Sequence, residues 1–177
     1  MEKFTNVWYI YNKGWVVRMN DRVRYAVANA NDIARYYLSR HEMSHKKLQK
    51  IIYYAYVWFI ALNNDDAEHI VNVLFAEQPE AWVHGPVFPS VYNEYKSNSW
   101  EDIQLGISPI TFKSNALNEF LEQIWSVFGD YNADQLEFMT HHEAPWKVAR
   151  KRIPSYEPSN VNLDNRIIFE FYNSIND

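Results

Sequence analysis

The chain has 177 residues, a formal net charge of −5, 17% aromatic residues and no cysteine. This length suits a single domain with one substantial core. The lack of cysteine excludes a disulfide framework, a thiolate metal site and cysteine catalysis. Residues 1–19 carry scattered charges and no continuous apolar stretch, so they do not resemble an export signal, and we expect a cytoplasmic protein.

Charge is distributed unevenly along the sequence. Residues 1–50 hold ten basic and four acidic side chains, whereas residues 51–145 hold two basic and fourteen acidic ones. A negative field repels nucleic acid and attracts a basic partner. The middle of the chain therefore favours a basic protein as partner and no direct contact with nucleic acid, unless it is an ordinary solvated surface.

Residues 1–25 are expected to form an N-terminal extension of the helical domain that spans residues 26–177. Within the extension, VWYIY and WVVRM flank the turn-forming NKG, a pattern typical of a β-hairpin. Asn31 or Asp32 is then expected to cap a helix that continues through Arg40, because their side chains accept hydrogen bonds from free N–H groups of a first turn.

Twelve consecutive apolar or aromatic residues, IIYYAYVWFIAL, occupy positions 51–62. A helix that is apolar on every face cannot lie on a surface, so the rest of the chain must enclose it. With Ser44 as the expected N-cap, the pattern predicts a buried central helix from His45 to Leu62. The stretch is well short of the roughly 20 residues that span a membrane, and no membrane partner is expected.

The segment after the central helix mixes short strands with chain breaks. VNVLFA and EAWV resemble strands separated by Pro79, and Gly85 and Pro86 interrupt the chain. Pro89 fits the first turn of a helix that ends near Lys96.

The last third of the chain predicts helices. Ser114 caps an amphipathic helix that stops at Gly129, and Asn132 with Gln135 starts a second helix that runs through Met139. Two more helices are expected, at residues 145–150 and in the tail from Asn162, where an apolar stripe that includes Ile175 should dock on the core. Together these elements predict a mainly α fold of the α+β class, a compact helical domain around a buried central helix with a small β-sheet or hairpin.

The sequence HEMSH at residues 41–45 matches H-E-x-x-H, which places two imidazoles on one helical face with a glutamate base between them. His41 and His45 are thus candidate zinc ligands, with Glu68 as a third, and a zinc-dependent hydrolase is one alternative. However, Ser44 lies where one helix is expected to stop and the next to begin, and two lysines follow the second histidine. The competing interpretation is a turn with two solvent-facing histidines and neither a metal nor another cofactor.

A second histidine cluster is THHEAPW at residues 140–146. Imidazole beside carboxylate suits a proton relay or a weak metal site, but the motif contains no nucleophile. We favour a structural role, in which Thr140 and one histidine satisfy backbone groups at a helix end while Trp146 packs after Pro145. His84, in WVHGPV, is likewise expected to be a buried, hydrogen-bonded turn histidine.

The chain closely resembles the Panacea domain family in three segments: LQKIIYYAYVWFIAL at 48–62, EAWVHGPVFPSVYNEYK at 80–96 and THHEAPWKVAR at 140–150. These are the SocA-like antitoxins, also known as phage-associated GepA-like proteins, and the resemblance extends over about residues 26–175. The positions that match the family's signature, for which a structural role is expected, are Leu48, Gln49, Lys50, Tyr53, Tyr54, Trp82, His84, Gly85, Pro86, Pro89, Thr140, His141, Glu143, Pro145 and Trp146.

The resemblance implies an antitoxin of a toxin-antitoxin system, commonly carried on a prophage or another mobile element, that neutralises a cognate toxin by direct protein–protein binding. One kind of member is an adaptor that delivers its toxin to a cytoplasmic ATP-dependent protease. The family brings no catalytic residues, so no enzyme activity is expected. A nucleic-acid-binding regulator that uses the basic segment at residues 1–50 is the remaining alternative.

The acidic middle of the chain is the expected docking face. A toxin that attacks RNA or nucleotides must hold phosphate with basic residues, so an acidic protein suits its cleft. Aromatic side chains would supply the anchors of the interface, and Tyr95 and Trp100 are expected to be exposed. The residues predicted to bind the partner are Glu80, Tyr92, Glu94, Tyr95, Trp100, Glu101 and Asp102.

Overall fold

The computed structural model describes residues 26–27, 29–98 and 101–175. The expected hairpin within residues 1–25 and the side chain of Trp100 lie outside the described residues, and the boundary at residue 26 stays a prediction. The described elements are seven α-helices, a short 3-10 helix and two small antiparallel sheets, which confirms the mainly helical fold with a minor β component.

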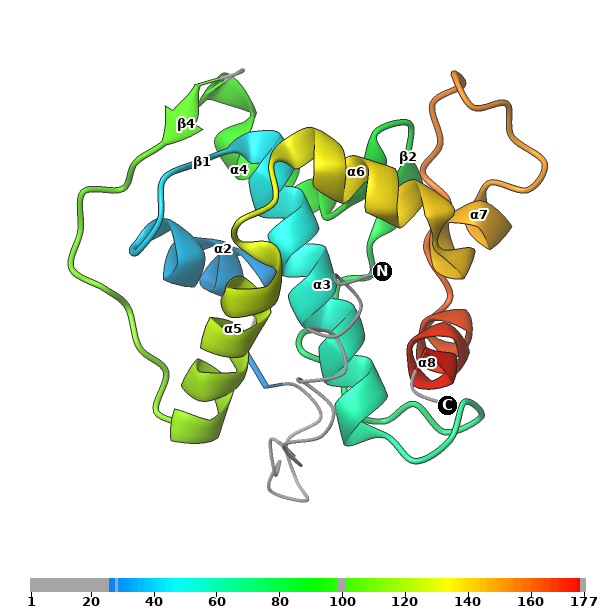
Figure 1. The fold of residues 1–177 in the computed structure, drawn as a ribbon, viewed down its shortest axis with the longest axis horizontal. Helices are drawn as coiled ribbons and strands as arrows, with labels where there is room; N and C mark the ends of the chain where they lie inside the picture. Colours follow the sequence, from blue (N-terminus) through cyan, green and yellow to red (C-terminus); the bar gives the residue numbers. More distant parts are fainter. Residues whose placement is uncertain (1–25, 28, 99–100, 176–177) are drawn as a thin grey trace.

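The central helix, α3 (His45–Asn63), is confirmed and forms the axis of the molecule. In Figure 1 it runs through the middle, with α5 (Asn115–Phe128) on one side, α8 (Asn165–Ser174) on the other and α6 (Ala133–His142) across its N-terminal half. Its residues from Leu48 to Ala61 are all buried, as an apolar helix requires. The hydroxyl group of Ser44 accepts a hydrogen bond from the backbone N–H of Lys47, so the predicted N-cap is correct.

The first described helix, α2 (Ala30–Leu38), begins earlier and ends earlier than predicted. Asn29 is the N-cap, because its side chain accepts from the N–H of Asp32 while the Asp32 carboxylate accepts from the N–H of Asn29. This reciprocal capping box satisfies two free N–H groups at once, which a cap at Asn31 or Asp32 cannot do. Arg40 lies beyond the helix, where its guanidinium group covers the ring of Tyr36.

The two sheets are formed by pairs of very short strands. β1 (Met43–Ser44) pairs with β4 (Asp102–Ile103), and β2 (Glu80–Trp82) pairs with β3 (Gly85–Val87) in a hairpin. The predicted strand EAWV is thus confirmed, whereas VNVLFA is irregular apart from an isolated bridge at Val73. Its three central apolar side chains are all buried, which an alternating half-exposed strand would not allow.

Helix α4 (Pro89–Tyr95) begins at its proline as expected and leads into the 3-10 helix η1 (Lys96–Asn98). Helix α7 (Ala144–Ala149) begins and ends one residue earlier than predicted, and Pro145 is the second residue of its first turn. Ser114 caps α5 and Asn132 caps α6, with the predicted partner Gln135 completing a capping box. Helix α6 continues three residues beyond Met139. In the tail, Asp164 caps α8, and its buried face contains Phe169 and Tyr172. Ile175 lies past the helix end and is exposed, so the predicted stripe was wrong at that position.

The core extends from α2 to α8 and is rich in aromatic contacts. Tyr54 stacks on Phe128 with ring centroids 3.9 Å apart, and Trp58 meets the ring of Tyr172 edge-on. Such pairs add to the free energy gained by burying the rings. Of the helices in the described residues, none is both long and apolar enough to cross a bilayer.

Candidate partner-binding site

The signature residues of the three segments meet at the N-terminal half of α3. Lys50 is fully buried, and its ammonium group donates a hydrogen bond of 3.0 Å to the carbonyl oxygen of Pro86 on β3. Burial lowers the pKa of Lys50 to about 7. Beside it, Gly85 has φ of +90°, and a Cβ there would lie 2.7 Å from Oγ1 of Thr140 and 2.8 Å from Cε of Lys50. The close contact of α3, β3 and α6 therefore requires glycine at this position.

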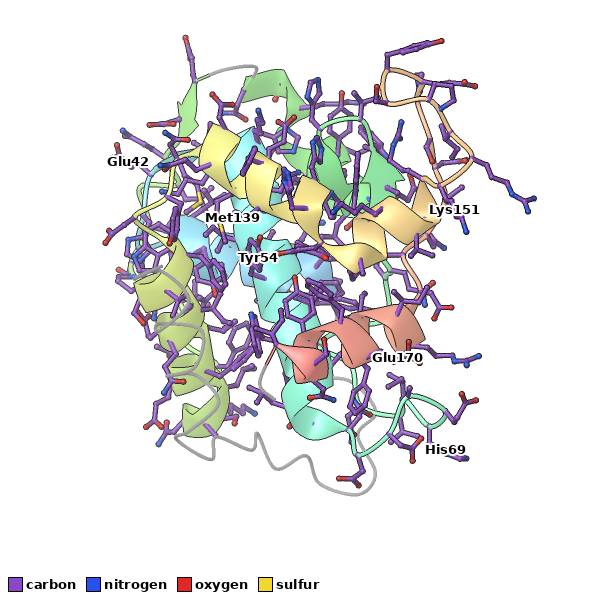
Figure 2. All side chains as sticks on the ribbon, turned by 45° about the vertical axis from the view of Figure 1, so that its right-hand side comes forward. Glu42, Tyr54, His69, Met139, Lys151 and Glu170 are labelled. Atoms are coloured by element: carbon purple, nitrogen blue, oxygen red, sulfur yellow. The ribbon has the colours of Figure 1, made fainter. Side chains whose placement is uncertain are left out.

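Glu143 lies at the junction of α6 and α7 and connects it to α3 and α8. Its carboxylate accepts hydrogen bonds from the hydroxyl groups of Tyr54 at 2.9 Å, Tyr172 at 2.8 Å and Tyr53 at 3.3 Å. We call these four residues the tyrosine cluster, and Figure 2 shows Tyr54 in the interior between α6 and α8. Glu143 is partly exposed as a residue, but burial of its carboxyl group raises the pKa to about 7, against the opposing effect of the tyrosine hydrogen bonds.

Gln49 fixes the entry to α4. Its side-chain oxygen accepts from the N–H of Phe88 at 2.8 Å, and its amide nitrogen donates to the carbonyl oxygen of the same residue at 3.3 Å. The indole N–H of Trp146 donates to the carbonyl oxygen of Trp82 at 3.0 Å, and the ring of His141 stacks on Trp146. Most signature residues thus pack and form hydrogen bonds inside the molecule.

Among the signature residues, His84 and Trp82 contribute side chains to the surface of the β2–β3 hairpin. The imidazole of His84 was expected to be buried, but 74% of its side chain is exposed, and it lies 3.1 Å from the carboxylate of Glu137. Sequence alone could not show this, because the tight β2–β3 turn directs the side chain outward. Trp82 is half-buried, with its ring 4.8 Å from that of Tyr92.

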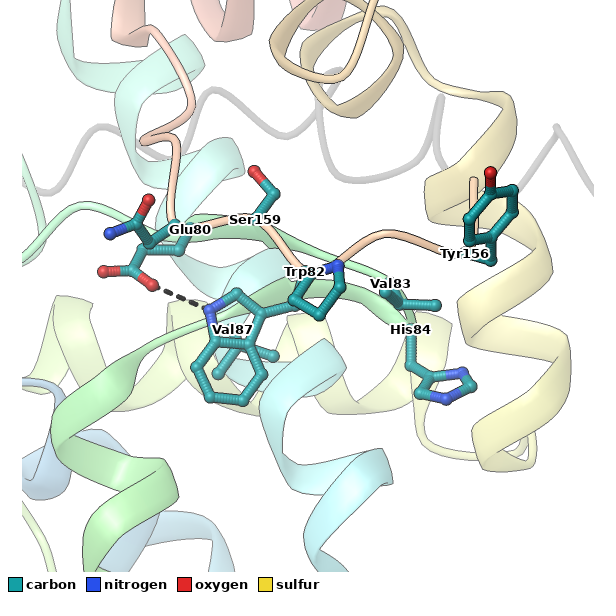
Figure 3. Close-up of a pocket in the computed structure, with 9 residues that line it drawn as sticks. Glu80, Trp82, Val83, His84, Val87, Tyr156 and Ser159 are labelled. Atoms are coloured by element: carbon teal, nitrogen blue, oxygen red, sulfur yellow. Dashed lines mark hydrogen bonds between the residues drawn. The ribbon is translucent and has the colours of Figure 1, made fainter. Parts of the chain in front are cut away.

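These two side chains line a surface groove of about 720 Å³ between the β2–β3 hairpin and the loop at residues 156–160. We call it the hairpin groove. In Figure 3, Glu80 and Trp82 lie towards one end and His84 and Tyr156 towards the other. The carboxylate of Glu80 accepts a hydrogen bond of 2.7 Å from the indole N–H of Trp82. The groove is lined by Glu80, Trp82, Val83, His84, Val87, Tyr156, Pro158, Ser159 and Asn160.

Arg150 holds the outer wall of this groove. It is 4% exposed, and its guanidinium group donates hydrogen bonds to the carbonyl oxygens of Ala81 on β2 and of Pro154, Ser155 and Glu157 in the loop. Neither Arg150 nor the loop was among the predicted functional residues. The proline at each side of SYE was the available signal, since it predicts an ordered turn rather than a flexible linker.

The residues predicted to bind the partner do not form a single face. Glu80 lies in the hairpin groove, and Tyr92 packs half-buried behind Trp82. Tyr95 was expected to be exposed, but it is 7% exposed, because it ends α4 with its ring turned towards the core. The remaining acidic residues are all exposed, and we call them the α4–β4 carboxylates: Glu94, Glu101 and Asp102.

The acidic middle of the chain is likewise not one continuous surface. Glu137 binds Lys46, Glu122 binds Arg40, and Glu143 points into the tyrosine cluster. Such paired carboxylates add little to the field outside the protein. Asp102 shares a polar pocket with Glu42 and Asp134, but Lys47 lines the same pocket and Asp134 pairs with Lys46.

The HEMSH motif does not have the geometry of a zinc site. His41 follows the end of α2 and stacks on the ring of Trp125, with centroids 3.7 Å apart, whereas His45 is the first residue of α3. The two imidazoles are therefore not on one helical face. His45 is also buried rather than solvent-facing, and Glu68 pairs with Arg166 at 2.7 Å. Among the described residues, no group of three or more metal-binding side chains is close enough to hold an ion.

Comparison with known proteins agrees with the signature residues. A family model described as "Antitoxin SocA-like, Panacea domain" matches residues 48–147. The chain is 30% identical over 137 residues to Antitoxin SocA of Caulobacter vibrioides (strain NA1000 / CB15N), a match that covers 71% of this chain and 67% of that protein. No solved structure matches the chain. The matched range contains every signature position from Leu48 to Trp146.

Proposed function

The chain belongs to the SocA-like antitoxin family with the Panacea domain, and on that premise we propose that it neutralises a cognate toxin by direct protein–protein binding. The observation that carries the proposal is that the signature residues are divided between the interior of the domain and its surface. Those inside the molecule hold the helices together, while Trp82 and His84 reach the surface at the hairpin groove. A rigid scaffold with a preformed surface suits recognition of another protein.

Glu143 and Lys50, whose pKa values burial shifts to about 7, are not assigned to catalysis. A carboxyl group and an amine with pKa near 7 are typical of active sites. Here, however, the hydrogen bonds of Glu143 go to buried tyrosines, and Lys50 is bonded to the carbonyl oxygen of Pro86. Neither group faces the hairpin groove, so both are assigned to the structure of the domain.

Binding of nucleic acid is not favoured by the described part of the basic segment. Arg35 is exposed, but Arg40 pairs with Glu122, and Lys46 with Asp134. Lys47 donates to the carbonyl oxygen of Gly129 and covers the ring of Trp125, and Lys50 is buried. Cations with internal partners are not available to phosphate groups, on which affinity for nucleic acid depends.

The α4–β4 carboxylates are proposed to guide the encounter with a basic toxin. Exposed charges change the association rate more than the dissociation rate. Replacing all three with lysine should therefore slow association, most clearly at low ionic strength, where screening is weak. A matched control replaces three exposed acidic residues on other elements with lysine: Asp65, Glu119 and Glu170.

Co-expression tests the proposal. The neighbouring open reading frame is expressed alone and together with this chain, and growth and co-purification are measured. We expect the neighbouring product to arrest growth alone and to be harmless and bound when the chain is present. A neighbouring product that is harmless alone, or that stays lethal beside this chain, contradicts the proposal.

The proposed neutralisation proceeds either by covering the toxin or by delivering it to a cytoplasmic ATP-dependent protease. The half-life of the toxin separates the two mechanisms. An adaptor shortens the half-life in cells that contain the protease and leaves it unchanged in cells that lack it. An occluding antitoxin restores growth in both kinds of cell without loss of the toxin.

A further inference from the structure

The hairpin groove has rigid walls before any ligand is present. On its inner side, the N–H of Ala81 donates to the carbonyl oxygen of Val161 at 2.8 Å, and the N–H of Leu163 donates to that of Pro79 at 2.8 Å. Glu80 and Asn162 also form an antiparallel bridge. The loop at residues 154–162 is therefore attached to the hairpin along its return path.

The outer wall is fixed by the buried guanidinium group of Arg150. It donates to carbonyl oxygens at 2.7 Å on β2 and at 2.7 to 3.3 Å in the loop. Hydrogen bonds from a charged donor are roughly twice as strong as neutral ones. Because the wall is already ordered, binding a ligand here costs less conformational entropy than ordering a mobile loop around it.

The chemistry of the lining is apolar with one formal charge. Trp82, Val83, Val87 and Pro158 supply aliphatic and aromatic surface, and Glu80 is the acidic residue among the lining side chains. The bond to Trp82 uses Oε2 of Glu80 and leaves Oε1 for a ligand. At the other end, Tyr156 is 81% exposed, a large aromatic side chain at the mouth of the groove.

Resting on the proposed function, we propose that the hairpin groove binds an extended segment of the cognate toxin that carries an apolar side chain next to an arginine or lysine. The apolar side chain packs over Trp82 and Val87, and the basic group pairs with the carboxylate of Glu80. Tyr156 covers the segment from the side of the loop. An exposed tyrosine supplies contact area with little loss of side-chain entropy, which makes it a suitable anchor.

The charge of the groove selects this occupant. A carboxylate beside indole and valine side chains favours a cation that is flanked by apolar groups, and it disfavours an acidic or phosphorylated segment. The groove lies between a hairpin and a loop and has a volume of about 720 Å³, which leaves room for a short extended segment.

Two variants and two matched controls test the inference with the product of the neighbouring open reading frame. Glu80→Lys reverses the charge in the groove, and Tyr156→Ala removes an exposed ring whose loss does not disturb the core. Glu170→Lys and Val71→Ala make the same kinds of change on exposed positions outside the groove. We expect about tenfold or greater loss of affinity for each groove variant and less than about twofold for each control.

Short overlapping peptides that cover the neighbouring product identify the segment. At least one peptide with adjacent apolar and basic residues should bind the wild-type chain and compete with the full toxin, and Glu80→Lys should abolish this binding. Peptides that all fail to bind overturn the inference, as do groove variants with unchanged affinity for a toxin that the wild type binds. In those cases the proposed antitoxin function stands.

Other occupants give different results and equally overturn the inference. If a second copy of this chain occupies the groove, light scattering shows that the wild type is a dimer and that the Glu80→Lys variant is a monomer. If the chain's own N-terminal segment, residues 1–25, occupies the groove, the intact chain binds no peptide. The chain from which this segment has been deleted then binds peptide more strongly. A wild-type chain that binds neither toxin nor peptide removes the proposed function together with this inference.

Discussion

The hydroxyl group of Tyr54 donates a 2.9 Å hydrogen bond to the carboxylate of Glu143, 89 residues further along the chain. Tyr172, from α8, donates to the same carboxylate at 2.8 Å. One acidic side chain at the α6–α7 junction thereby ties the central helix to the last helix. A carboxyl group in this environment is stabilised in its neutral form, and its pKa is raised to about 7.

Replacement of Glu143 with glutamine should change how stability depends on pH. Between pH 4.5 and 7 the folded state holds the Glu143 proton and the unfolded state has released it, so the free energy of unfolding falls as pH rises. Each pKa unit corresponds to about 1.4 kcal/mol, so the loss is up to about 3 kcal/mol. A glutamine side chain cannot ionise, and the Glu143→Gln variant should lack this decline.

The measurement is urea unfolding of both proteins between pH 4.5 and 8. His41, His45 and His141, whose pKa values are lowered by burial, titrate in this range too and give an opposite slope. The difference between wild type and variant removes their contribution, because both proteins contain them. A difference that does not change with pH contradicts a neutral Glu143 in the folded state.

Lys50→Met should remove a stability increase at alkaline pH. Burial lowers the pKa of Lys50 to about 7 from 10.5, so between these values the unfolded state holds a proton that the folded state lacks. The free energy of unfolding of the wild type therefore rises with pH in this window. Methionine has a similar length and no charge, and its variant should be more stable than wild type near pH 7.

The comparison is best made between pH 7 and 9.5, before the tyrosines ionise in the unfolded state. We expect the stability difference between Lys50→Met and wild type to shrink steadily as pH rises. The methionine leaves the carbonyl oxygen of Pro86 without its partner, which costs about 1 to 3 kcal/mol at every pH. A difference that stays constant from pH 7 to 9.5 would mean that Lys50 is charged in the folded state throughout.

The sequence predicted the helical framework well where local signals were sufficient. Ser114 and Asn132 were correctly predicted as the N-caps of α5 and α6, because an N-cap side chain accepts from an N–H group only three residues further along the chain. The apolar run of α3 was buried as expected, since no surface arrangement is possible for it. In the NAND sequence, several residues can cap, and the reciprocal bond with Asp32 selects Asn29 over the predicted positions.

The binding surface was harder to predict, because it depends on contacts between distant segments. The exposure of His84 follows from the β2–β3 turn, and the burial of Tyr95 follows from the packing of α4 on α2 and α3. Arg150 acts on a loop that follows it, through carbonyl oxygens that carry no sequence signature. Glu80 was predicted to bind the partner, but its position beside Trp82 in a groove was not predicted.

Gly85→Ala should destabilise the protein strongly. The residue has φ of +90°, which side chains rarely adopt, and its Cβ would lie under 3 Å from both Thr140 and Lys50. Gly106 is a matched control, since its φ is +59° and a Cβ there meets nothing within 4 Å. We expect a loss of about 3 kcal/mol or more for Gly85→Ala and about 1 kcal/mol for Gly106→Ala in urea unfolding. Equal losses would mean that backbone strain alone requires glycine at residue 85.

Arg150→Met should loosen the wall of the hairpin groove. The variant keeps most of the apolar volume of the side chain but leaves the carbonyl oxygens of Ala81, Pro154 and Glu157 without their charged donor. Unsatisfied buried groups of this kind cost about 1 to 3 kcal/mol each, and water reaches those in the loop, so we expect a total loss of about 3 kcal/mol. Arg152→Met is the control, because Arg152 is exposed two residues away.

The sites of proteolytic cleavage distinguish a loosened groove wall from a general loss of stability. Limited proteolysis should cut Arg150→Met within residues 153–160 under conditions that leave wild type and Arg152→Met intact, because the loop opens without global unfolding. Arg150→Lys should fall between wild type and Arg150→Met, since an ammonium group restores the charge but not the planar fork that reaches both β2 and the loop. Cleavage spread over the whole chain, or equal protection of all three proteins, would show that Arg150 does not hold the loop in place.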